Sequence, residues 1–426
     1  MCASNDRASN GRAPLPVQSP LAATQTCSRC SRRGMVWLVY VRAQLKRHSS
    51  HRASSLSTWI RRTSISRIGG APSPEQFAHV FDHRGDPLGV GLYSPDSEIT
   101  IRMLHRGAAP LEANWLERRV HAAIQRRATL MPGGTTGYRE INAEGDGLPG
   151  LTVDRYGTHR VVQITTAPMF VRRDEIARAL DTIDPRPTTW LVPATASKRE
   201  AIPTICEGPS VEALHYRELG LELETDPPPA QKTGAYHDQR ENRARVAEIA
   251  QRHGGRLLDL GCHIGGFSLH AAARGVSCVA VDQSEAALTR VASNAAKNNL
   301  GSIVPVRADI FRPLEHPELQ GTFGAIVFDP PKMASAARDV NRALDAMERT
   351  LSQLIPRLDP GGTLIVCSCS HHLDITAIDR AIARTSVRIA EPMLRIERRG
   401  PGLDHPCCPF HPEGGYLSVG LYTRRS

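Results

Sequence analysis

The C-terminal half of the chain shows a regular alternation of strand and helix patterns, which constrains the fold more than any other feature. Short β-type runs predict strands at 257–260, 277–281, 303–306, 325–328 and 363–367. Amphipathic segments predict helices over 239–253, 265–274, 285–299 (capped by Ser284), 340–357 and 373–385. Strands that alternate with helices form a parallel sheet with helices on both faces. We therefore predict an α/β fold with a mostly parallel sheet.

The start of the chain is patterned differently. Residues 1–35 are rich in Ser, Arg, Ala, Gly and Pro and show no periodicity. We predict a disordered basic leader there, with an organelle transit peptide as the alternative. Short β-type runs separated by turn signals follow over residues 36–110 and predict a small β-barrel.

A mixed segment connects this barrel to the alternating region. Its helices are expected at 111–130 and 173–182, and its strands near 161–165, 189–193 and 218–224. We predict a middle α/β domain over residues 111–226. The Pro227-Pro228-Pro229 run marks the boundary to a last domain over residues 227–426.

The chain is basic, and its excess of positive charge is confined to the start. It holds 53 Lys and Arg against 43 Asp and Glu, a formal charge of +10. Residues 1–70 contain twelve of the basic residues and one acid, Asp6, so they carry +11 and the rest of the chain carries −1. A concentrated positive charge favours a polyanionic partner, and we expect RNA to be bound there.

Other features exclude several classes of protein. The longest apolar run, Met35 to Val41, is far shorter than the ~20 residues of a membrane-spanning helix, so no membrane is expected. Ten irregularly spaced cysteines without a secretory signal are typical of reduced thiols in the cytoplasm. Cys27 and Cys30 form a lone CxxC, and no metal site is expected.

A glycine-containing turn after the first strand of the last domain is the first candidate site. Asp259 ends the strand, and Gly261, Gly265 and Gly266 let a ligand approach the backbone where the next helix begins, beside Phe267. The spacing is not G-x-G-x-x-G, which argues against a dinucleotide site.

Two acids follow the next strands. Asp282 is placed to bind ribose hydroxyls, and Asp309 is placed to lie beside an adenine. Open α/β sheets bind ligands at the carboxyl ends of their strands. A glycine turn that serves only packing is the alternative for any one of these features, but their order predicts a pocket for S-adenosylmethionine.

The fourth strand of this domain ends at Asp329-Pro330-Pro331-Lys332. Two consecutive prolines cannot continue a central strand, so they predict a rigid turn at the ligand edge of the sheet. Such a turn suits a planar base held next to a methyl donor. A plain strand terminator is the alternative.

The fifth strand ends at Cys367-Ser368-Cys369-Ser370. Most cysteines in buried strands are small hydrophobic residues without chemistry. At this edge, however, a thiolate can add to C6 of cytosine and make C5 nucleophilic. Methylation of a ring nitrogen needs no such thiol. We favour Cys369 as the nucleophile, although Cys367 is two residues away and on the same side of a strand.

Further motifs make the chain recognisable: Gln231-Lys232-Thr233-Gly234, Asp238-Gln239-Arg240, the stretch 144–157 and the terminal Pro412-Glu413…Tyr416-Leu417. Together with the motifs above they resemble the large-subunit ribosomal-RNA methyltransferase I family, over roughly residues 56–426. Members of that family form 5-methylcytosine in bacterial 23S ribosomal RNA. The resemblance implies a PUA domain, a middle domain and a Rossmann-like class I methyltransferase domain with a mostly parallel seven-stranded sheet.

The resemblance also implies roles for individual residues. Cys369 would be the nucleophile, and Asp329 would help to hold the cytosine. The residues implied to line the cofactor or substrate cleft are Lys232, Thr233, Arg240, Pro330, Pro331 and Lys332.

Two positions depart from the family pattern. Residues 57–60 read Ser-Thr-Trp-Ile where the family usually has His-Pro-Trp, which bears on the affinity of the PUA domain. The family's glycine after Ser-Cys-Ser is replaced by His371-His372, which is either polar surface or a base near the target pocket.

We therefore predict an S-adenosylmethionine-dependent RNA cytosine-C5 methyltransferase of the cytoplasm that acts on 23S ribosomal RNA, with a homodimer as a further hypothesis. The first alternative is methylation of a base nitrogen, such as guanine N7, since related enzymes share the Lys-Thr-Gly and Asp-Pro-Pro signatures but lack this cysteine. The second alternative is a non-catalytic RNA-binding protein with the same fold.

Overall fold

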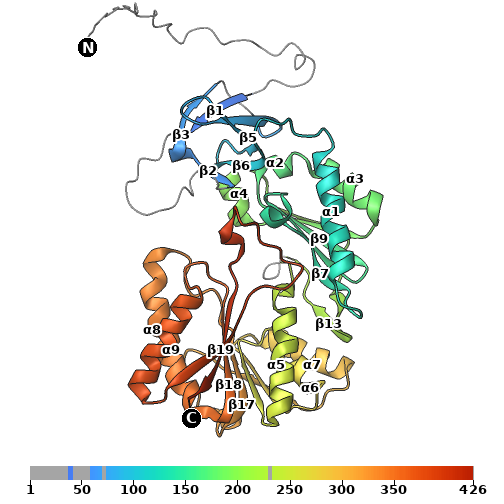
Figure 1. The fold of residues 1–426 in the computed structure, drawn as a ribbon. Coiled ribbons are helices and arrows are strands. Elements are labelled where there is room, and N and C mark those ends of the chain that lie inside the picture. Colours follow the sequence, from blue (N-terminus) through green and yellow to red (C-terminus); the bar gives the residue numbers. More distant parts are fainter. Residues whose placement is uncertain (1–36, 42–57, 70–72, 229–232, 426) are drawn as a thin grey trace, which may run out of the picture. The chain divides into compact units, whose positions relative to one another are not determined.

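The structure, a computed structural model, describes residues 37–41, 58–69, 73–228 and 233–425 (Figure 1). The predicted leader over 1–35 and the predicted site residue Lys232 lie outside the described residues.

The first described sheet has six strands in the order β2-β6-β5-β4-β1-β3. They are β1 (Trp37–Val41), β2 (Trp59–Arg61), β3 (Ile65–Ile68), β4 (Phe77–Phe81), β5 (Pro87–Tyr93) and β6 (Ile99–Arg106). β1 pairs with β4 in parallel, and the other neighbours are antiparallel. Its buried core includes Val39, Val80 and Ile101. The series of short strands predicted for this region is confirmed.

The middle segment contains a five-stranded sheet in the order β11-β10-β9-β8-β7. Its strands are β7 (Gly137–Asn142), β8 (Leu151–Tyr156), β9 (His159–Ile164), β10 (Thr188–Val192) and β11 (Ile205–Glu207). Its helices are α1 (Trp115–Leu130), α2 (Ala167–Phe170), α3 (Arg173–Ile183) and α4 (Ala194–Glu200). The buried positions of α1, Leu116 and Val120, are four residues apart and pack with Val153 and Val162 of the sheet.

One strand prediction in this segment is wrong. Residues 218–224 do not form a single strand; they belong to a hairpin of β12 (Leu214–Glu218) and β13 (Leu221–Thr225). The reversal lies at Leu219 and Gly220, which have φ angles of 50° and 92°. A two-residue turn with positive φ at both positions matches the twist of the strands that it joins.

The last sheet has seven strands in the order β16-β15-β14-β17-β18-β20-β19. They are β14 (Leu257–Leu260), β15 (Cys278–Asp282), β16 (Ile303–Arg307), β17 (Phe323–Phe328), β18 (Leu358–Ser368), β19 (Met393–Arg399) and β20 (Ser418–Arg424). The first five are parallel, whereas β20 is antiparallel to β18 and β19. The predicted mostly parallel sheet is confirmed.

Helices cover both faces of this sheet: α5 (Arg240–His253), α6 (Gly266–Ala272), α7 (Glu285–Lys297), α8 (Val340–Leu354) and α9 (Ile375–Ile389) (Figure 1). Alternate residues of β17 face opposite layers. Ile326 and Phe328 share a core with α8 and α9, while Ala325 and Val327 share one with α5 and α6. This two-sided burial explains why β17 reads as a continuous apolar run. Ser284 caps α7 as predicted, since its Oγ accepts from the Ala287 amide at 3.2 Å.

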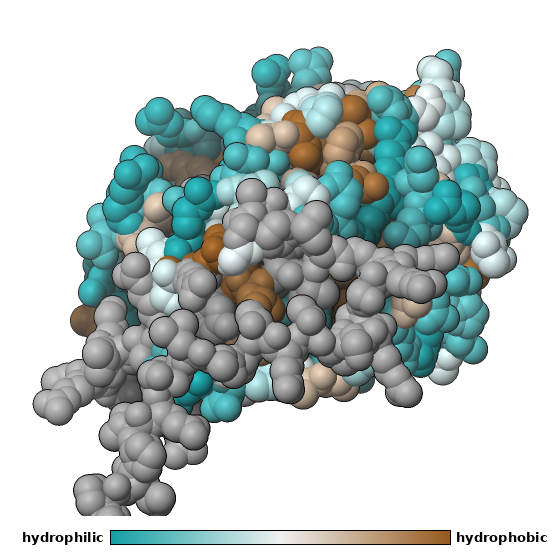
Figure 2. All heavy atoms as spheres, turned by 90° about the horizontal axis from the view of Figure 1, so that it is seen from above, coloured by the Kyte–Doolittle hydropathy of each residue, from teal (hydrophilic) through white to brown (hydrophobic). Residues whose placement is uncertain are grey.

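Within the described residues, no helix combines the length and the apolar character needed to cross a membrane. The face in Figure 2 is mostly hydrophilic, with apolar side chains gathered in small patches between polar ones.

Candidate functional site at the carboxyl edge of the parallel sheet

The strand order reverses between β14 and β17, and the loops that follow these two strands touch each other. The Asp329 amide donates to the carbonyl oxygen of Leu260 at 3.0 Å. Gly261 has a φ angle of 80°, and a Cβ atom on it would clash with the carbonyl oxygen of Asp329. Glycine is therefore required at position 261 both by backbone conformation and by space. This switch point is where open α/β sheets bind ligands.

Asp259 holds the start of α6 against the end of β14. Its Oδ2 accepts from the Ser268 amide at 3.1 Å and from the Ser268 hydroxyl at 2.8 Å. The side chain is fully buried, and burial raises the pKa of its carboxyl group to about 6. Its Oδ1 is buried and makes no hydrogen bond within the described residues, so an acceptor remains at this position.

The remaining glycines keep the turn compact. Gly265 has a φ angle of 84° and precedes α6. A Cβ on Gly266 would clash with the guanidinium of Arg243, so that side chain can pass only over a glycine. The Phe267 side chain packs in the core between α5, α6 and the sheet, and its contact with a cofactor stays a prediction. His263 lies between the glycines with a φ angle of 51°, which is rare for a residue with a side chain.

The two further acids differ in how firmly they are held. Asp282, at the end of β15, accepts from the His263 amide at 3.1 Å and from the Ser284 amide at 2.9 Å, and so ties the glycine turn to α7. Asp309 was expected at the end of a strand, but β16 ends at Arg307. It therefore lies exposed in the following loop, where it accepts from the Phe311 amide at 2.9 Å.

These groups fit S-adenosylmethionine. The cofactor carries hydroxyl and ammonium groups, which need acceptors such as the buried Asp259 Oδ1 and the Asp282 carboxylate. Gly261 lets the loop that begins at Asp329 lie against the turn that carries these acceptors.

Asp329 follows β17 and is held by a neighbouring amide. Its Oδ2 accepts from Gln239 Nε2 at 3.0 Å, and Gln239 in turn accepts from Asn242 Nδ2 at 2.7 Å. Pro330 is buried, whereas Pro331 and Lys332 are exposed. The loop that they begin is fixed to the end of β18, since Ser370 Oγ donates to the carbonyl oxygen of Ala334 at 2.6 Å.

The two cysteines at the end of β18 have different environments. Cys367 is fully buried, and burial raises the pKa of its thiol well above its ordinary value. Cys369 is half-buried and lies just beyond the last residue of the strand. β17 and β18 run in parallel, with Phe328 paired to Val366, so Asp329 and Cys369 leave the sheet at the same edge.

Tyr236 lies next to this pair. Burial and the negative charge of Asp329 raise the pKa of its hydroxyl, and Cys369 acts on it in the same direction. Its ring meets that of His263 edge to face, with centroids 5.0 Å apart. Tyr236 therefore connects the glycine turn with the Asp329–Cys369 end of the site.

Thr233 and Arg240, two residues implied to line the cleft, are buried in the structure. Thr233 Oγ1 donates to Asp154, and Arg240 donates to both carboxylate oxygens of Asp404 at 3.0 and 3.1 Å. In this arrangement both side chains form contacts within the protein. Their direct contact with a ligand stays a prediction.

The sequence reasoning missed several residues that build the site. Asp154 accepts two hydrogen bonds from Arg139, at 2.9 and 3.0 Å, while it holds Thr233. Asp404 lies in a segment, residues 400–411, that follows β19 on the way to β20 and that we call the strap. The 144–157 motif contains Asp154 and was the available signal for it. No local pattern marks Asp404.

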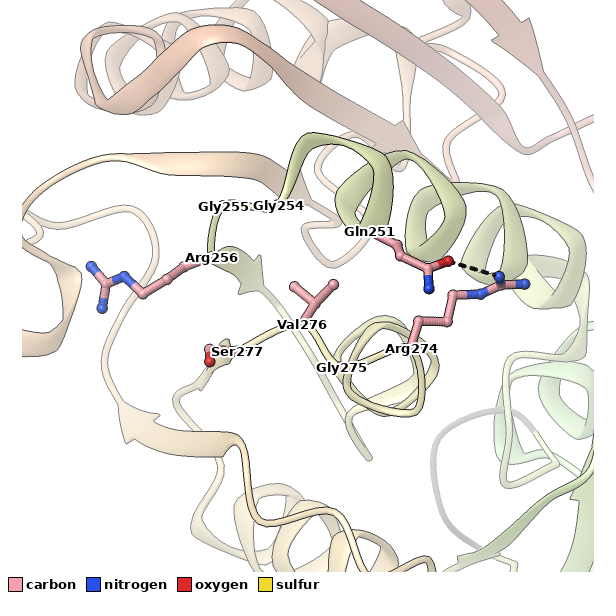
Figure 3. Close-up of a pocket in the computed structure, with 8 residues that line it drawn as sticks. All are labelled: Gln251, Gly254, Gly255, Arg256, Arg274, Gly275, Val276 and Ser277. Carbon is pink, nitrogen blue, oxygen red and sulfur yellow. Dashed lines mark hydrogen bonds between the residues drawn. The ribbon is translucent and has the colours of Figure 1, made fainter.

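A small cavity of about 150 Å³ lies elsewhere (Figure 3). Its lining includes Gln251, Gly254 and Gly255, which precede β14, and Arg274 and Ser277, which precede β15. It is therefore at the amino ends of the strands, opposite to the site. Among the residues that the structure describes, no cluster of three or more His, Cys, Asp or Glu side chains is arranged to hold a metal ion.

In the comparison with known proteins, two family models match different parts of the chain. A family described as PUA-like domain matches residues 43–106, and a family described as S-adenosylmethionine-dependent methyltransferase matches residues 190–399. Among solved structures, SMU.776 in complex with SAH has a TM-score of 0.74 at 17% identity and covers 92% of this chain and 100% of its own. This similarity shows the fold.

Full-length relatives are also similar in sequence. The ribosomal RNA large subunit methyltransferase I of Shewanella frigidimarina is 32% identical over 90% of this chain and 99% of its own. A ribosomal RNA large subunit methyltransferase of Deinococcus radiodurans is 34% identical over 76% of this chain and 83% of its own. The methyl donor is therefore S-adenosylmethionine, and the chain belongs to the ribosomal RNA large subunit methyltransferase I family.

Proposed function

We propose that this protein methylates C5 of a cytosine in large-subunit ribosomal RNA, with Cys369 as a covalent nucleophile. Asp329 holds the base, and Asp259, Gly261 and Asp282 hold the methyl donor. The names of the full-length relatives support ribosomal RNA as the substrate. The PUA-like match and the +11 charge of residues 1–70 support RNA binding at the start of the chain.

One observation carries the proposal for C5. A partly accessible thiol, Cys369, leaves the sheet at the same edge as Asp329, while the nearby Cys367 is fully buried. C5 of cytosine is a poor nucleophile, so a thiol at this position has a chemical task that methylation of a nitrogen would not require.

The reaction balances as follows. The Cys369 thiolate forms a bond to C6, and the electron pair of the C5–C6 double bond makes C5 nucleophilic. S-adenosylmethionine, when bound, would supply an electrophilic methyl group to C5, so that the C5–CH3 bond forms as the S–CH3 bond breaks and S-adenosylhomocysteine is left. Loss of the C5 proton to a base then re-forms the double bond and expels the thiolate from C6. Asp329 contributes by accepting a hydrogen bond from the amino group of the cytosine, which fixes the ring between the thiol and the donor.

Bisulfite mapping of ribosomal RNA tests this function, because 5-methylcytosine resists deamination. RNA is compared from cells with the gene, without it, and with the Cys369→Ala variant. We expect one cytosine to be protected only by the wild-type protein. An unchanged cytosine map would contradict the proposal, and a methylated base nitrogen detected by nucleoside mass spectrometry would replace it. Failure of the purified protein to bind S-adenosylmethionine would favour a non-catalytic RNA-binding role.

A further inference from the structure

A chain of four side chains leads from the edge strand β19 to Asp329. Arg399 Nε donates to Asn242 Oδ1 at 2.8 Å, Asn242 Nδ2 donates to Gln239 Oε1 at 2.7 Å, and Gln239 Nε2 donates to Asp329 Oδ2 at 3.0 Å. Gln239 and Asn242 are almost completely buried. We call Arg399, Asn242 and Gln239 the amide relay.

The hydrogen bonds of the amide relay can be donated in only one direction, from Arg399 toward Asp329. A guanidinium has five donors and no acceptor, so the atom of Asn242 that faces Arg399 must be its oxygen. The amide nitrogen of Asn242 then faces Gln239, and Gln239 must turn its own nitrogen to Asp329. The Arg399 end is anchored by Glu397, whose Oε1 accepts from Arg399 Nη1 at 2.5 Å.

A second contact fixes the same orientation of Asn242. Its Nδ2 also donates to the carbonyl oxygen of Gly400 at 3.1 Å. An inverted Asn242 would place its oxygen against that carbonyl and its nitrogen against the Arg399 guanidinium. Both contacts would be repulsive, and in a buried site such a mismatch is costly.

The direction of the relay places a hydrogen-bond donor at one oxygen of Asp329. A donor at Oδ2 favours the ionised carboxylate over the protonated acid. The two oxygens of a carboxylate carry about four acceptor sites, so Asp329 can accept further hydrogen bonds while it is held by Gln239. Cytosine offers an amino group as a donor at C4, whereas uracil offers a carbonyl oxygen. An ionised Asp329 placed opposite C4 therefore accepts a hydrogen bond from the amino group of cytosine, whereas it repels the C4 carbonyl oxygen of uracil.

We infer that Gln239 is a positioning residue that keeps Asp329 an acceptor, and that Asn242 and Arg399 fix its orientation, so that the relay determines the choice of cytosine over uracil. This inference rests on the proposed function, since it assigns Asp329 to the target base. Gln239 acts through Asp329 and does not itself contact the reacting atoms.

The test uses the full chain and two ribosomal RNA fragments, one with the target cytosine and one with uridine in its place. The variants are Gln239→Glu and Arg399→Gln, and the matched control is Arg398→Gln on the neighbouring exposed residue of β19. In Gln239→Glu two carboxyl groups face each other and share one proton, so Asp329 is no longer held in the ionised form by a fixed donor, while the side chain at position 239 keeps nearly the same size.

For Gln239→Glu we expect kcat on the cytosine RNA to fall at least tenfold, with KM for RNA changed less than threefold. The preference for cytosine over uridine should fall at least tenfold as well. Arg399→Gln should also lower kcat, by three- to tenfold, and Arg398→Gln should match wild type. Affinity for S-adenosylmethionine and the melting temperature are measured for each variant to separate this effect from misfolding.

Wild-type kcat and wild-type discrimination in both Gln239→Glu and Arg399→Gln would overturn the inference. Equal losses on both RNAs, accompanied by a lower melting temperature, would also overturn it, because they would show a purely structural role. A wild-type product other than 5-methylcytosine would instead contradict the proposed function, and the effect of the relay variants on kcat would still be measurable.

Discussion

Burial separates the two cysteines at the end of β18, although they are only two residues apart. Cys367 lies in the core between the sheet, α5 and α6, whereas Cys369 is half-buried beyond the strand. We expect Cys369→Ala to lower methyl transfer by ~10³-fold or more, because the covalent step is lost. Cys367→Ala should keep measurable activity and cost about 1–2 kcal/mol of stability from a small cavity. Single-turnover assays with labelled donor compare the two; equal losses would contradict the assignment.

A second residue, His237, makes the stability of the folded chain depend on pH. It is buried between Tyr156 and Tyr216, with ring centroids 5.0 and 5.4 Å away. Burial lowers the pKa of its imidazole to about 4. The unfolded chain binds a proton near pH 6.5 while the folded chain does not, so stability is complete above pH 6.5 and is lost as the pH falls toward 4.

We therefore expect wild type to lose about 2–3 kcal/mol more than His237→Phe between pH 7 and pH 4.5. The measurement is denaturant unfolding of both proteins at the two pH values. His83→Gln, in the exposed turn after β4, is the control and should follow wild type. Parallel pH dependence of wild type and His237→Phe would contradict the assignment.

At this scale the sequence motifs indicate which residues gather at the site but not how they are bonded. Gly261 and Asp329 were both expected at the ligand edge, and the structure places them in contact. Thr233 was expected in the cleft, but its partner Asp154 lies on another sheet. Such partners are distant in sequence, and no periodicity encodes a contact between two domains.

Among the elements, the strap over residues 400–411 contacts both the middle segment and the six-stranded sheet. Asp404 binds Arg240, and the Arg127 guanidinium of α1 donates to the Asp404 carbonyl oxygen at 2.8 Å. The His411 ring lies 4.2 Å from the Trp59 ring of β2. Trp59 therefore contacts the strap. The residues that precede Trp59 are those that depart from the family pattern.

The strap leaves no space for a side chain at Gly145. A Cβ there would clash with the carbonyl oxygen of Pro406, while the φ angle at Gly145 is not positive, so the effect of a substitution is steric. We expect Gly145→Ala to destabilise the protein by about 1–3 kcal/mol. It should also lower kcat, because Arg240 next to Gln239 loses its fixed partner on the strap.

Gly133→Ala is the matched control, since no heavy atom lies within 4 Å of a Cβ at that position. Thermal unfolding and methyl transfer are measured for both variants. If Gly145→Ala behaved like Gly133→Ala, the strap would not be packed against the middle segment as described.

Elements with two-sided or clearly amphipathic burial were predictable from the sequence. The parallel strands β14 to β18 and helices α5 to α9 were all expected, with ends that differ by a few residues. Two strands, β19 and β20, were not expected; in β19 exposed charged residues interrupt the apolar ones. The hairpin at Leu219 was missed because leucine rarely adopts a positive φ angle.

For the whole molecule, charge and chemistry are divided along the chain. Residues 1–70 carry +11, whereas the rest, which contains the site, carries −1. We expect deletion of residues 1–70 to weaken RNA binding and to flatten its dependence on salt, since fewer phosphate contacts release fewer counterions. Titrations of RNA and of S-adenosylmethionine at several salt concentrations test this. A large loss of cofactor affinity would show that the parts are not separable.

A small β-barrel and an α/β domain were predictable because each has its own pattern of strands and helices, and the resemblance to the family implied a PUA domain and a methyltransferase domain, which the family models match. The limits 36–110, 111–226 and 227–426, the cytoplasmic location and the homodimer stay predictions. Contacts of the strap cross the expected domain limits. Asn142 of the middle segment, for example, donates to the Pro406 carbonyl oxygen at 3.0 Å. Local sequence patterns do not encode such crossings.

The most direct test of covalent catalysis at Cys369 uses RNA with 5-fluorocytidine at the target position. The fluorine at C5 cannot leave as a proton does, so the enzyme is trapped on C6 after methyl transfer. Denaturing electrophoresis and mass spectrometry should show a one-to-one adduct on Cys369 that requires S-adenosylmethionine. The adduct should be absent in Cys369→Ala and present in Cys367→Ala. Methylation of the ordinary RNA without any trapped adduct, or an adduct on another residue, would contradict the account.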